Sequence, residues 1–153
     1  MQRPVRWRIG LLAAALWWGS LTALGLVVVP LLFVHLPSLA MAGAMAAKLF
    51  SAQTWVGSGC AMLMLLVFKQ KEALVQSTQA QAAMKLIVAG LLLAWLVEFG
   101  VEPRIVAARA DGGNLRLWHG LGSALLLGQW LCASAVLWRL SASAAAPVPG
   151  KSG

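Results

Sequence analysis

Charged residues are scarce in this chain, and acidic residues are the scarcest. Of 153 residues only four are Asp or Glu, charged residues make up 10%, and cysteine and histidine occur twice each. Hydrophobic residues fill 61% of the sequence, and the mean hydropathy is +0.83. A soluble domain of this length could not bury so much apolar surface. The composition therefore predicts a membrane protein with a single compact domain.

The few reactive residues exclude several classes of activity. Cys60 and Cys132 fall inside predicted membrane spans, so we expect no structural disulfide, and they fit no zinc-binding spacing. The sequence has no nucleophile–base arrangement, glycine-rich phosphate loop or metalloprotease motif, and it predicts neither an enzyme nor a cofactor. The formal charge of +8 is typical of juxtamembrane Lys and Arg that meet anionic lipid headgroups. No aromatic–basic platform accompanies this charge, so we expect lipids rather than nucleic acid as partners. A homo-oligomer or another membrane protein stays open as a partner, and no small-molecule substrate is indicated.

Four apolar stretches divide the chain, and each meets the length needed to cross a hydrocarbon core. The first follows a basic start but lacks a small-x-small cleavage site, so we expect a retained signal-anchor helix. The predicted fold is all-α, an antiparallel bundle of four transmembrane helices. The predicted organisation is a basic N-terminus (1–8), a membrane domain (9–140) with spans at about 9–34, 50–68, 83–101 and 117–138, and a disordered tail (141–153).

Local signals refine the ends of these spans. Pro30 should kink or loosen the end of the first span. Ser38 is a plausible N-cap for a helix over 39–49, which either lies in the interface or continues into the second span. Further along, the sequence predicts a short helical connection over 70–81, a helix end at Glu102-Pro103 and a turn over 111–114.

The ionisable residues separate by predicted membrane side. Eight of the twelve Lys and Arg fall on the side of the termini, whereas both histidines and three of the four acids fall on the other. The positive-inside rule therefore predicts that both termini lie in the cytoplasm. Tryptophans at both predicted boundaries agree with this placement: Trp7 and Trp138 on one side, Trp55 and Trp118 on the other.

Small residues recur at four-residue spacing in every span, which predicts close helix packing. In the third span the series Gly90, Ala94 continues to Glu98 and Glu102, so Glu98 should face neighbouring helices rather than lipid. An ionised carboxylate that faced hydrocarbon would cost several kcal/mol. The series in the other spans are Ala15, Gly19, Ala23; Gly57, Ala61; and Gly120, Ala124, Gly128, Cys132.

These depths predict a polar cluster between the helix ends on the side away from the termini. Its members would be Glu98, Glu102, His119, Gln53 and Ser123, with His35 as a further possibility. The simplest interpretation is structural: the two glutamates pair with Arg104 or Arg116, and His119 caps a helix.

Three functional interpretations compete with the structural one. Glu98 and His119 could form an ion or proton site in a small transporter or channel component. His35 and His119 could ligate haem. Soft ligands on shared helix faces, Cys60 with Met64 and Met41 with Met45, could bind Cu(I).

The chain resembles the transmembrane protein 205-like domain family, whose bacterial members have no established function. The resemblance rests on short motifs over about residues 10–138: Leu16-Trp17-Trp18-Gly19, Val29-Pro30-Leu31-Leu32-Phe33, Lys48-Leu49-Phe50, Glu102-Pro103-Arg104 and Leu117-Trp118-His119-Gly120. It implies four membrane helices and a role in membrane stress or solute handling, and it marks Gly19, Pro30, Phe33, Phe50 and His119 as typical positions. Relatives often carry Ser and Asn where this chain has Gly122 and Leu126. That difference weakens a polar pathway down the fourth span.

Overall fold

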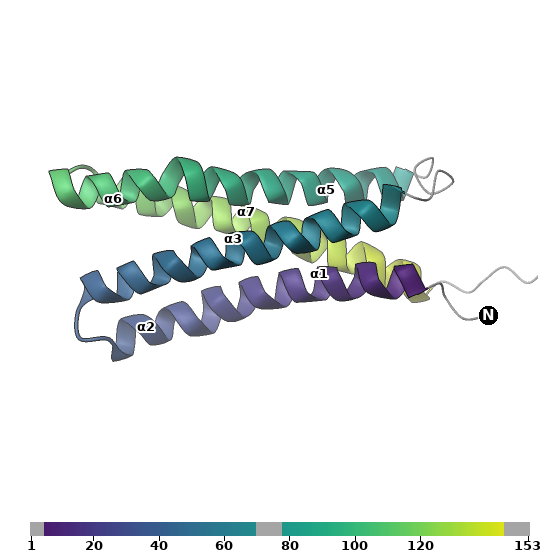
Figure 1. Cartoon of the computed structure of the whole chain (residues 1–153), viewed down its shortest axis with the longest axis horizontal. Coiled ribbons are helices and arrows are strands. Elements are labelled where there is room, and N and C mark those ends of the chain that lie inside the picture. The colour runs from purple at the N-terminus through teal and green to yellow at the C-terminus, as the bar shows by residue number, and fades with distance from the viewer. Residues whose placement is uncertain (1–4, 70–77, 146–153) are drawn as a thin grey trace, which may run out of the picture.

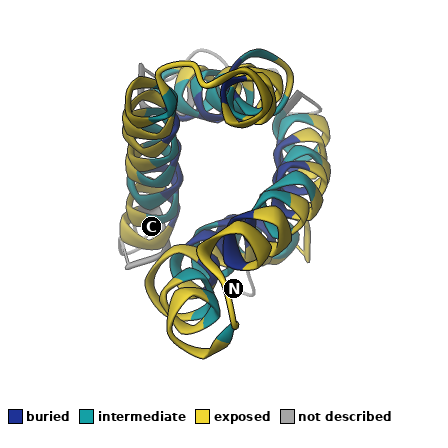
Figure 2. Cartoon of the chain, turned by 90° about the vertical axis from the view of Figure 1, so that its left-hand side faces the viewer, coloured by how far each residue is buried: buried dark blue, intermediate teal, exposed yellow. Residues whose placement is uncertain are grey.

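The computed structural model describes residues 5–69 and 78–145, and all regular elements within them are helical. Four helices are long and apolar enough to cross a membrane: Val5–His35, Leu39–Phe68, Gln81–Asp111 and Leu115–Ala142. Each packs on the next in chain order and the fourth packs on the first, so they form an antiparallel ring (Figures 1 and 2). The predicted all-α bundle of four membrane helices is confirmed.

The first and third membrane helices each contain a π-helical segment, whereas the second and fourth are regular α-helices. The first consists of α1 (Val5–Ala23), η1 (Leu24–Val28) and α2 (Val29–His35), and the second is α3 (Leu39–Lys69). The third consists of α5 (Thr78–Trp95), η2 (Leu96–Val101) and α6 (Glu102–Asp111), and the fourth is α7 (Leu115–Ala145).

The π segments explain why the third helix does not end where the sequence predicts. A proline inside a helix lacks an N–H, and its ring collides with the carbonyl four residues earlier. For Pro30 and Pro103 that carbonyl belongs to a residue of η1 or η2, where the widened turn makes room. The predicted helix end at Glu102-Pro103 is therefore wrong, and the helix continues through α6 to Asp111.

A short loop connects the two helices of each hairpin, and a side chain caps the start of the second helix. Ser38 is the predicted cap: its Oγ accepts the Met41 N–H at 3.2 Å, and α3 runs from Leu39 without a break. Residues 39–49 are thus continuous with the second span. In the second hairpin Gly112 ends α6 with φ +70°, and Asn114 Oδ1 accepts the Leu117 N–H at 3.0 Å. The predicted turn over 111–114 is confirmed.

Part of the predicted organisation falls outside the described residues. This is true of residues 1–4 and of most of the connection predicted over 70–81. The predicted tail begins too early, because α7 continues to Ala145, and residues 146–153 lie outside the described chain.

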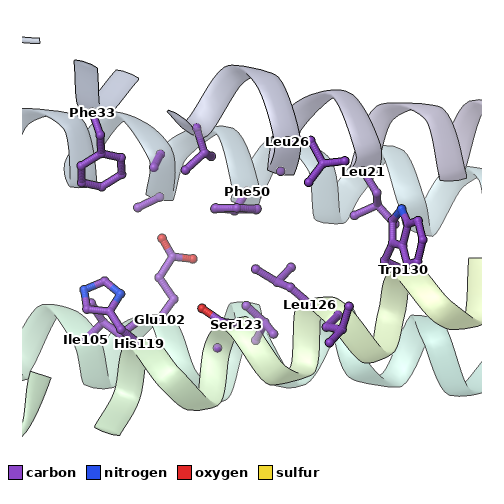
Figure 3. Close-up of a pocket in the computed structure, with 18 of the residues that line it drawn as sticks. Leu21, Leu26, Phe33, Phe50, Glu102, Ile105, His119, Ser123, Leu126 and Trp130 are labelled. Atoms are coloured by element: carbon purple, nitrogen blue, oxygen red, sulfur yellow. The ribbon is translucent and has the colours of Figure 1, made fainter. Parts of the chain in front are cut away.

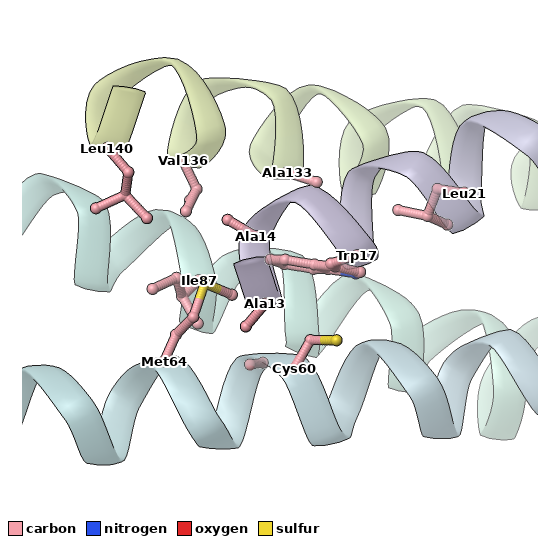
Figure 4. Packing of buried hydrophobic residues seen from close by; sticks show 11 residues of the cluster. Ala13, Ala14, Trp17, Leu21, Cys60, Met64, Ile87, Ala133, Val136 and Leu140 are labelled. Carbon is pink, nitrogen blue, oxygen red and sulfur yellow. The ribbon is translucent and has the colours of Figure 1, made fainter. Parts of the chain in front are cut away.

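One half of the bundle, here called the closed half, contains the hydrophobic core. Its centre is Trp17 on α1, which is fully buried among apolar side chains of the other helices (Figure 4). It also lies against glycines of two other helices. A Cβ on Gly90 would lie 2.6 Å from Trp17 Cη2, and a Cβ on Gly57 would lie 2.9 Å from Trp17 Nε1. The indole fits only because both positions are glycine. Around it pack Ala13, Ala14, Leu21, Cys60, Ala61, Met64, Ile87, Ala133, Val136 and Leu140.

Small-residue spacing identifies the packing face in α3, in α5 and in part of α7, but not in α1. Gly57, Ala61, Gly90 and Ala94 are buried as predicted. In α1, however, the buried face is Gly10, Ala13, Ala14, Trp17 and Leu21, and nothing lies within 4 Å of a Cβ placed on Gly19. In α7 the predicted series is right for Gly128 and Cys132, which face α5: a Cβ on Gly128 would lie 3.3 Å from Leu93 Cδ1, and Cys132 Cβ lies 3.2 Å from a Cβ placed on Gly90. Gly120 and Ala124 are exposed. Close packing of α1 depends on one large side chain, which spacing of small residues cannot reveal.

The other half, here called the open half, consists of η1, α2, the first part of α3, η2, α6 and the first part of α7. Here α2 packs on α3 and α6 packs on α7, so the two hairpins diverge as pairs (Figure 1). No residue of α2 is buried. The bundle thus has a filled end and an end where its two hairpins separate.

Candidate functional site

A cavity of about 650 Å³ lies between the diverging hairpins of the open half. Every one of the four membrane helices contributes to its wall (Figure 3). Most of the wall is apolar, with Phe33 and Phe50 from the first hairpin facing Ile105 and Leu126 from the second. Among the residues typical of the resemblance, Phe33 and Phe50 thus line the cavity, while Pro30 follows the π turn at its edge.

The polar groups in the wall come mainly from the second hairpin. Glu102, His119 and Ser123 line the cavity, and the Glu102 side chain projects into it toward the first hairpin (Figure 3). Glu102 is half-buried, and no described basic side chain forms an ion pair with it. A carboxyl group in such surroundings has few polar partners, so it favours a ligand that supplies a positive charge or a hydrogen-bond donor.

Glu98 lies one helical turn from Glu102 and is held from the neighbouring helix. Ser51 Oγ on α3 donates a hydrogen bond to Glu98 Oε1, and the side chains of Glu98 and Glu102 interact directly. Glu98 therefore connects the two hairpins along the α3–η2 seam. The predicted proximity of Glu98 to neighbouring helices holds in the structure, but its partner is Ser51 rather than His119.

Gln53 is separate from this group. It is buried deeper in the bundle, where its Nε2 donates to Ser20 Oγ of α1 at 2.9 Å. Gln129 and Trp17 lie at a similar depth, and Gln129 Nε2 and Trp17 Nε1 are buried without a hydrogen-bond partner. This polar layer forms the junction between the cavity and the core.

The two histidines differ in their surroundings. Both are exposed, but His119 lines the cavity, whereas His35 lies outside the set of lining residues and donates from Nδ1 to the Leu31 carbonyl at 3.0 Å. His119 does not cap α7, since Asn114 holds that position. The structure therefore gives the two histidines no shared site for an axial haem ligand pair.

The two arginines of α6 also occupy distinct places. Arg104 lies over the Trp118 ring, 5.1 Å from its centroid, in a cation–π contact rather than beside the glutamates. Arg109 lines the cavity and reaches α3, where a Cβ on Gly43 would lie 3.2 Å from Arg109 Cζ. Arg109 thus crosses from the second hairpin to the first at the end of the cavity.

The candidate soft-metal ligands are split between the core and the surface. Cys60 and Met64 are buried in the cluster around Trp17, where they pack against apolar side chains. Met41 and Met45 are exposed, at 51% and 45%. Among the described residues, no three of His, Cys, Asp and Glu are grouped to hold a metal ion.

Two site residues were not found from the sequence. No sequence pattern around Ser51 predicts its hydrogen bond to Glu98, because this bond depends on how η2 is rotated toward α3. Arg109 lies beyond the helix end that the sequence predicts at Glu102-Pro103, so the sequence gives no reason to place it beside the cavity. In the sequence, only the run of small residues around Gly43 indicates that another part of the chain packs closely against this segment, as Arg109 does in the structure.

Comparison with known proteins gives a family without an assigned activity. Residues 12–114 match the family model described as a domain of unknown function, DUF4149, which covers the first three membrane helices. No curated protein and no solved structure matches the chain. Because the match extends over more than half of the sequence, the chain belongs to the DUF4149 family.

Proposed function

We propose that this protein binds a drug-sized lipophilic cation within the membrane, in the cavity of the open half. The observation that carries this proposal is one carboxyl group, Glu102, projecting into an otherwise largely apolar space between two hairpins. The volume of about 650 Å³ falls in the range of roughly 300–1,000 Å³ that is usual for small-molecule sites. The function is therefore solute handling in the membrane.

The charge balance of the wall supports a cationic ligand. Glu102 interacts with a second carboxyl group, Glu98, and Arg109 extends to Gly43 at the end of the cavity instead of pairing with either. A ligand with one positive group and an apolar body would neutralise Glu102 and fill the space between Phe33, Phe50 and Leu126.

The packing of the closed half argues for a binding site rather than a continuous pore. Below the layer of Gln53 and Gln129, the described side chains between the helices are apolar and tightly packed around Trp17. An ion that crossed the whole bundle would have to pass through this core. The alternative of a proton or ion conductor built on Glu98 and His119 has no comparable support, since Glu98 bonds to Ser51.

The proposal also includes the membrane location, the orientation and the surroundings of the protein. The excess of Lys and Arg on the side of the termini supports cytoplasmic termini, in a bacterial inner membrane. In that orientation the cavity would lie in the outer half of the bilayer. The resemblance to the transmembrane protein 205-like family supports solute handling rather than catalysis. Lipids are its surroundings, and self-association or a membrane-protein partner is compatible with its exposed apolar surface.

Equilibrium binding of tetraphenylphosphonium to the protein in lipid nanodiscs tests the proposal. We expect saturable binding that Glu102→Gln weakens by tenfold or more, since charged hydrogen-bonding or ion-pair partners contribute about 1.5–3 kcal/mol. Asp111→Asn is the matched control, because it removes an exposed carboxyl outside the cavity. Absence of wild-type binding, or equal affinity in Glu102→Gln, would contradict a cation site.

A further inference from the structure

The two seams between the hairpins differ along the open half. On one side, α3 and the third membrane helix are joined at two levels, by Ser51 with Glu98 and by Gly43 with Arg109. On the other side, the last described links between the first and fourth helices are at Trp130. Its Nε1 donates to Thr22 Oγ1 at 2.9 Å, and its ring lies 6.5 Å from that of Trp18.

Beyond Trp130 the cavity itself occupies the seam between η1 and α7. Gly25 and Leu26 of η1 line it together with Leu126 and Leu127 of α7. Leu26 and Leu127 are also strongly exposed, at 71% and 58%. These leucines belong both to the cavity wall and to the outer surface of the bundle, which in a membrane faces lipid chains.

We propose that the ligand enters this cavity sideways from the bilayer, through a portal between η1 and α7 whose floor is Trp130. This inference rests on the proposed function and narrows its ligand to a lipophilic cation already dissolved in the membrane. The cation's apolar body passes between the leucines, and its charge reaches Glu102 on the far wall. Arg109 at the end of the cavity disfavours direct entry of a cation from water.

Gly25 provides a way to obstruct the portal without disturbing the fold. It lines the cavity, and nothing lies within 4 Å of a Cβ placed on it. Gly19 on the same membrane helix is equally free of neighbours but does not line the cavity. Gly25→Phe and Gly19→Phe therefore form a matched pair with one variant inside the portal and one outside it.

The experiment measures uptake and release of radiolabelled tetraphenylphosphonium by the protein in nanodiscs, using rapid filtration. We expect Gly25→Phe to slow both rates at least tenfold relative to Gly19→Phe, with Leu26→Trp as a second obstruction. Arg116→Ala removes an exposed charge at the same end of the bundle but outside the cavity wall, so it should leave both rates within about twofold. Thermal unfolding of each variant checks that the fold is retained.

Two results would overturn lateral entry. One is exchange in Gly25→Phe and Leu26→Trp as fast as in Gly19→Phe. The other is faster exchange in Arg109→Ala with no effect at Gly25, which would assign entry to the aqueous end. Failure of the proposed function is distinct, because it would appear as absent equilibrium binding in the wild-type protein.

Discussion

The closed and open halves are made from the same four helices, yet they are stabilised differently. In the closed half a buried tryptophan fits over Gly57 and Gly90, and apolar side chains fill the space around it. In the open half the helices meet as two pairs, and a cavity of about 650 Å³ replaces the core. The difference shows that the bundle concentrates its packing at one end and leaves the other available for binding.

The largest effect should come from removing the centre of the closed half. Trp17→Ala deletes a fully buried indole, and substitutions of this kind cost about 3–5 kcal/mol. We expect that loss in the free energy of unfolding, measured by SDS titration in mixed micelles. Trp138→Ala is the control, because Trp138 is 76% exposed and should change stability little. Equal losses in the two variants would remove the basis for distinguishing the halves.

A smaller effect is expected from overfilling the same place. A Cβ on Gly90 would lie 2.6 Å from Trp17 Cη2 and 3.2 Å from Cys132 Cβ. Gly90→Ala should therefore destabilise the protein by about 1–3 kcal/mol, as overpacked cores do. Gly59→Ala has no neighbour within 4 Å and should be neutral or slightly stabilising in the same titration. In a Trp17→Phe background, where the smaller ring leaves room for the new methyl group, Gly90→Ala should cost less free energy of unfolding than in the wild type. If the effects of the two substitutions on the free energy of unfolding simply add, the steric explanation is wrong.

In the open half a hydrogen bond between Ser51 and Glu98 joins the two hairpins. Ser51→Ala leaves Glu98 without its hydroxyl donor, and we expect a loss of about 1–2 kcal/mol. A double-mutant cycle with Glu98→Gln measures the coupling between the two side chains by the same unfolding assay. A coupling energy of zero would mean that this seam is held by packing alone.

The smallest effect should be at the cavity wall. Leu126→Ala removes a side chain that borders open space, so its cost should stay below about 1 kcal/mol. Ile87→Ala, a truncation in the closed half where the residue is fully buried, should cost about 2–5 kcal/mol. Unfolding titrations that ranked these two variants the other way round would mean that the cavity is filled in solution.

The sequence predicted the architecture well because span length and apolar content depend on local composition. Four spans, the cap at Ser38, the turn over 111–114 and the buried face of α5 were readable in this way. The helix end at Pro103 was missed because a π turn that accommodates proline leaves no mark in composition. Because the third membrane helix continues past Pro103 to Asp111, Arg109 lies on a helix in the cavity wall.

The candidate site was predicted only in part, because depth along a helix does not determine rotation about it. Glu102, His119 and Ser123 do share one cavity, as depth suggested. Gln53 lies at the expected level of its helix but turns toward Ser20, and His35 turns back to its own backbone. Cavity volume arises from the divergence of the hairpins, which is a property of whole helices rather than of any motif.

The paired π turns have a consequence for the symmetry of the molecule. The two hairpins repeat the same order of elements, since each has a π turn, a proline and then a capped long helix. Gln53 and Gln129 follow the caps Ser38 and Asn114 by the same number of residues, and both are buried. In the register of Pro30 and Pro103, however, Gly25 and Val29 correspond to Glu98 and Glu102. The two hairpins therefore differ at the cavity. The second hairpin provides the carboxyl groups, whereas the first has Gly25 and Val29 at the corresponding positions and leaves space there.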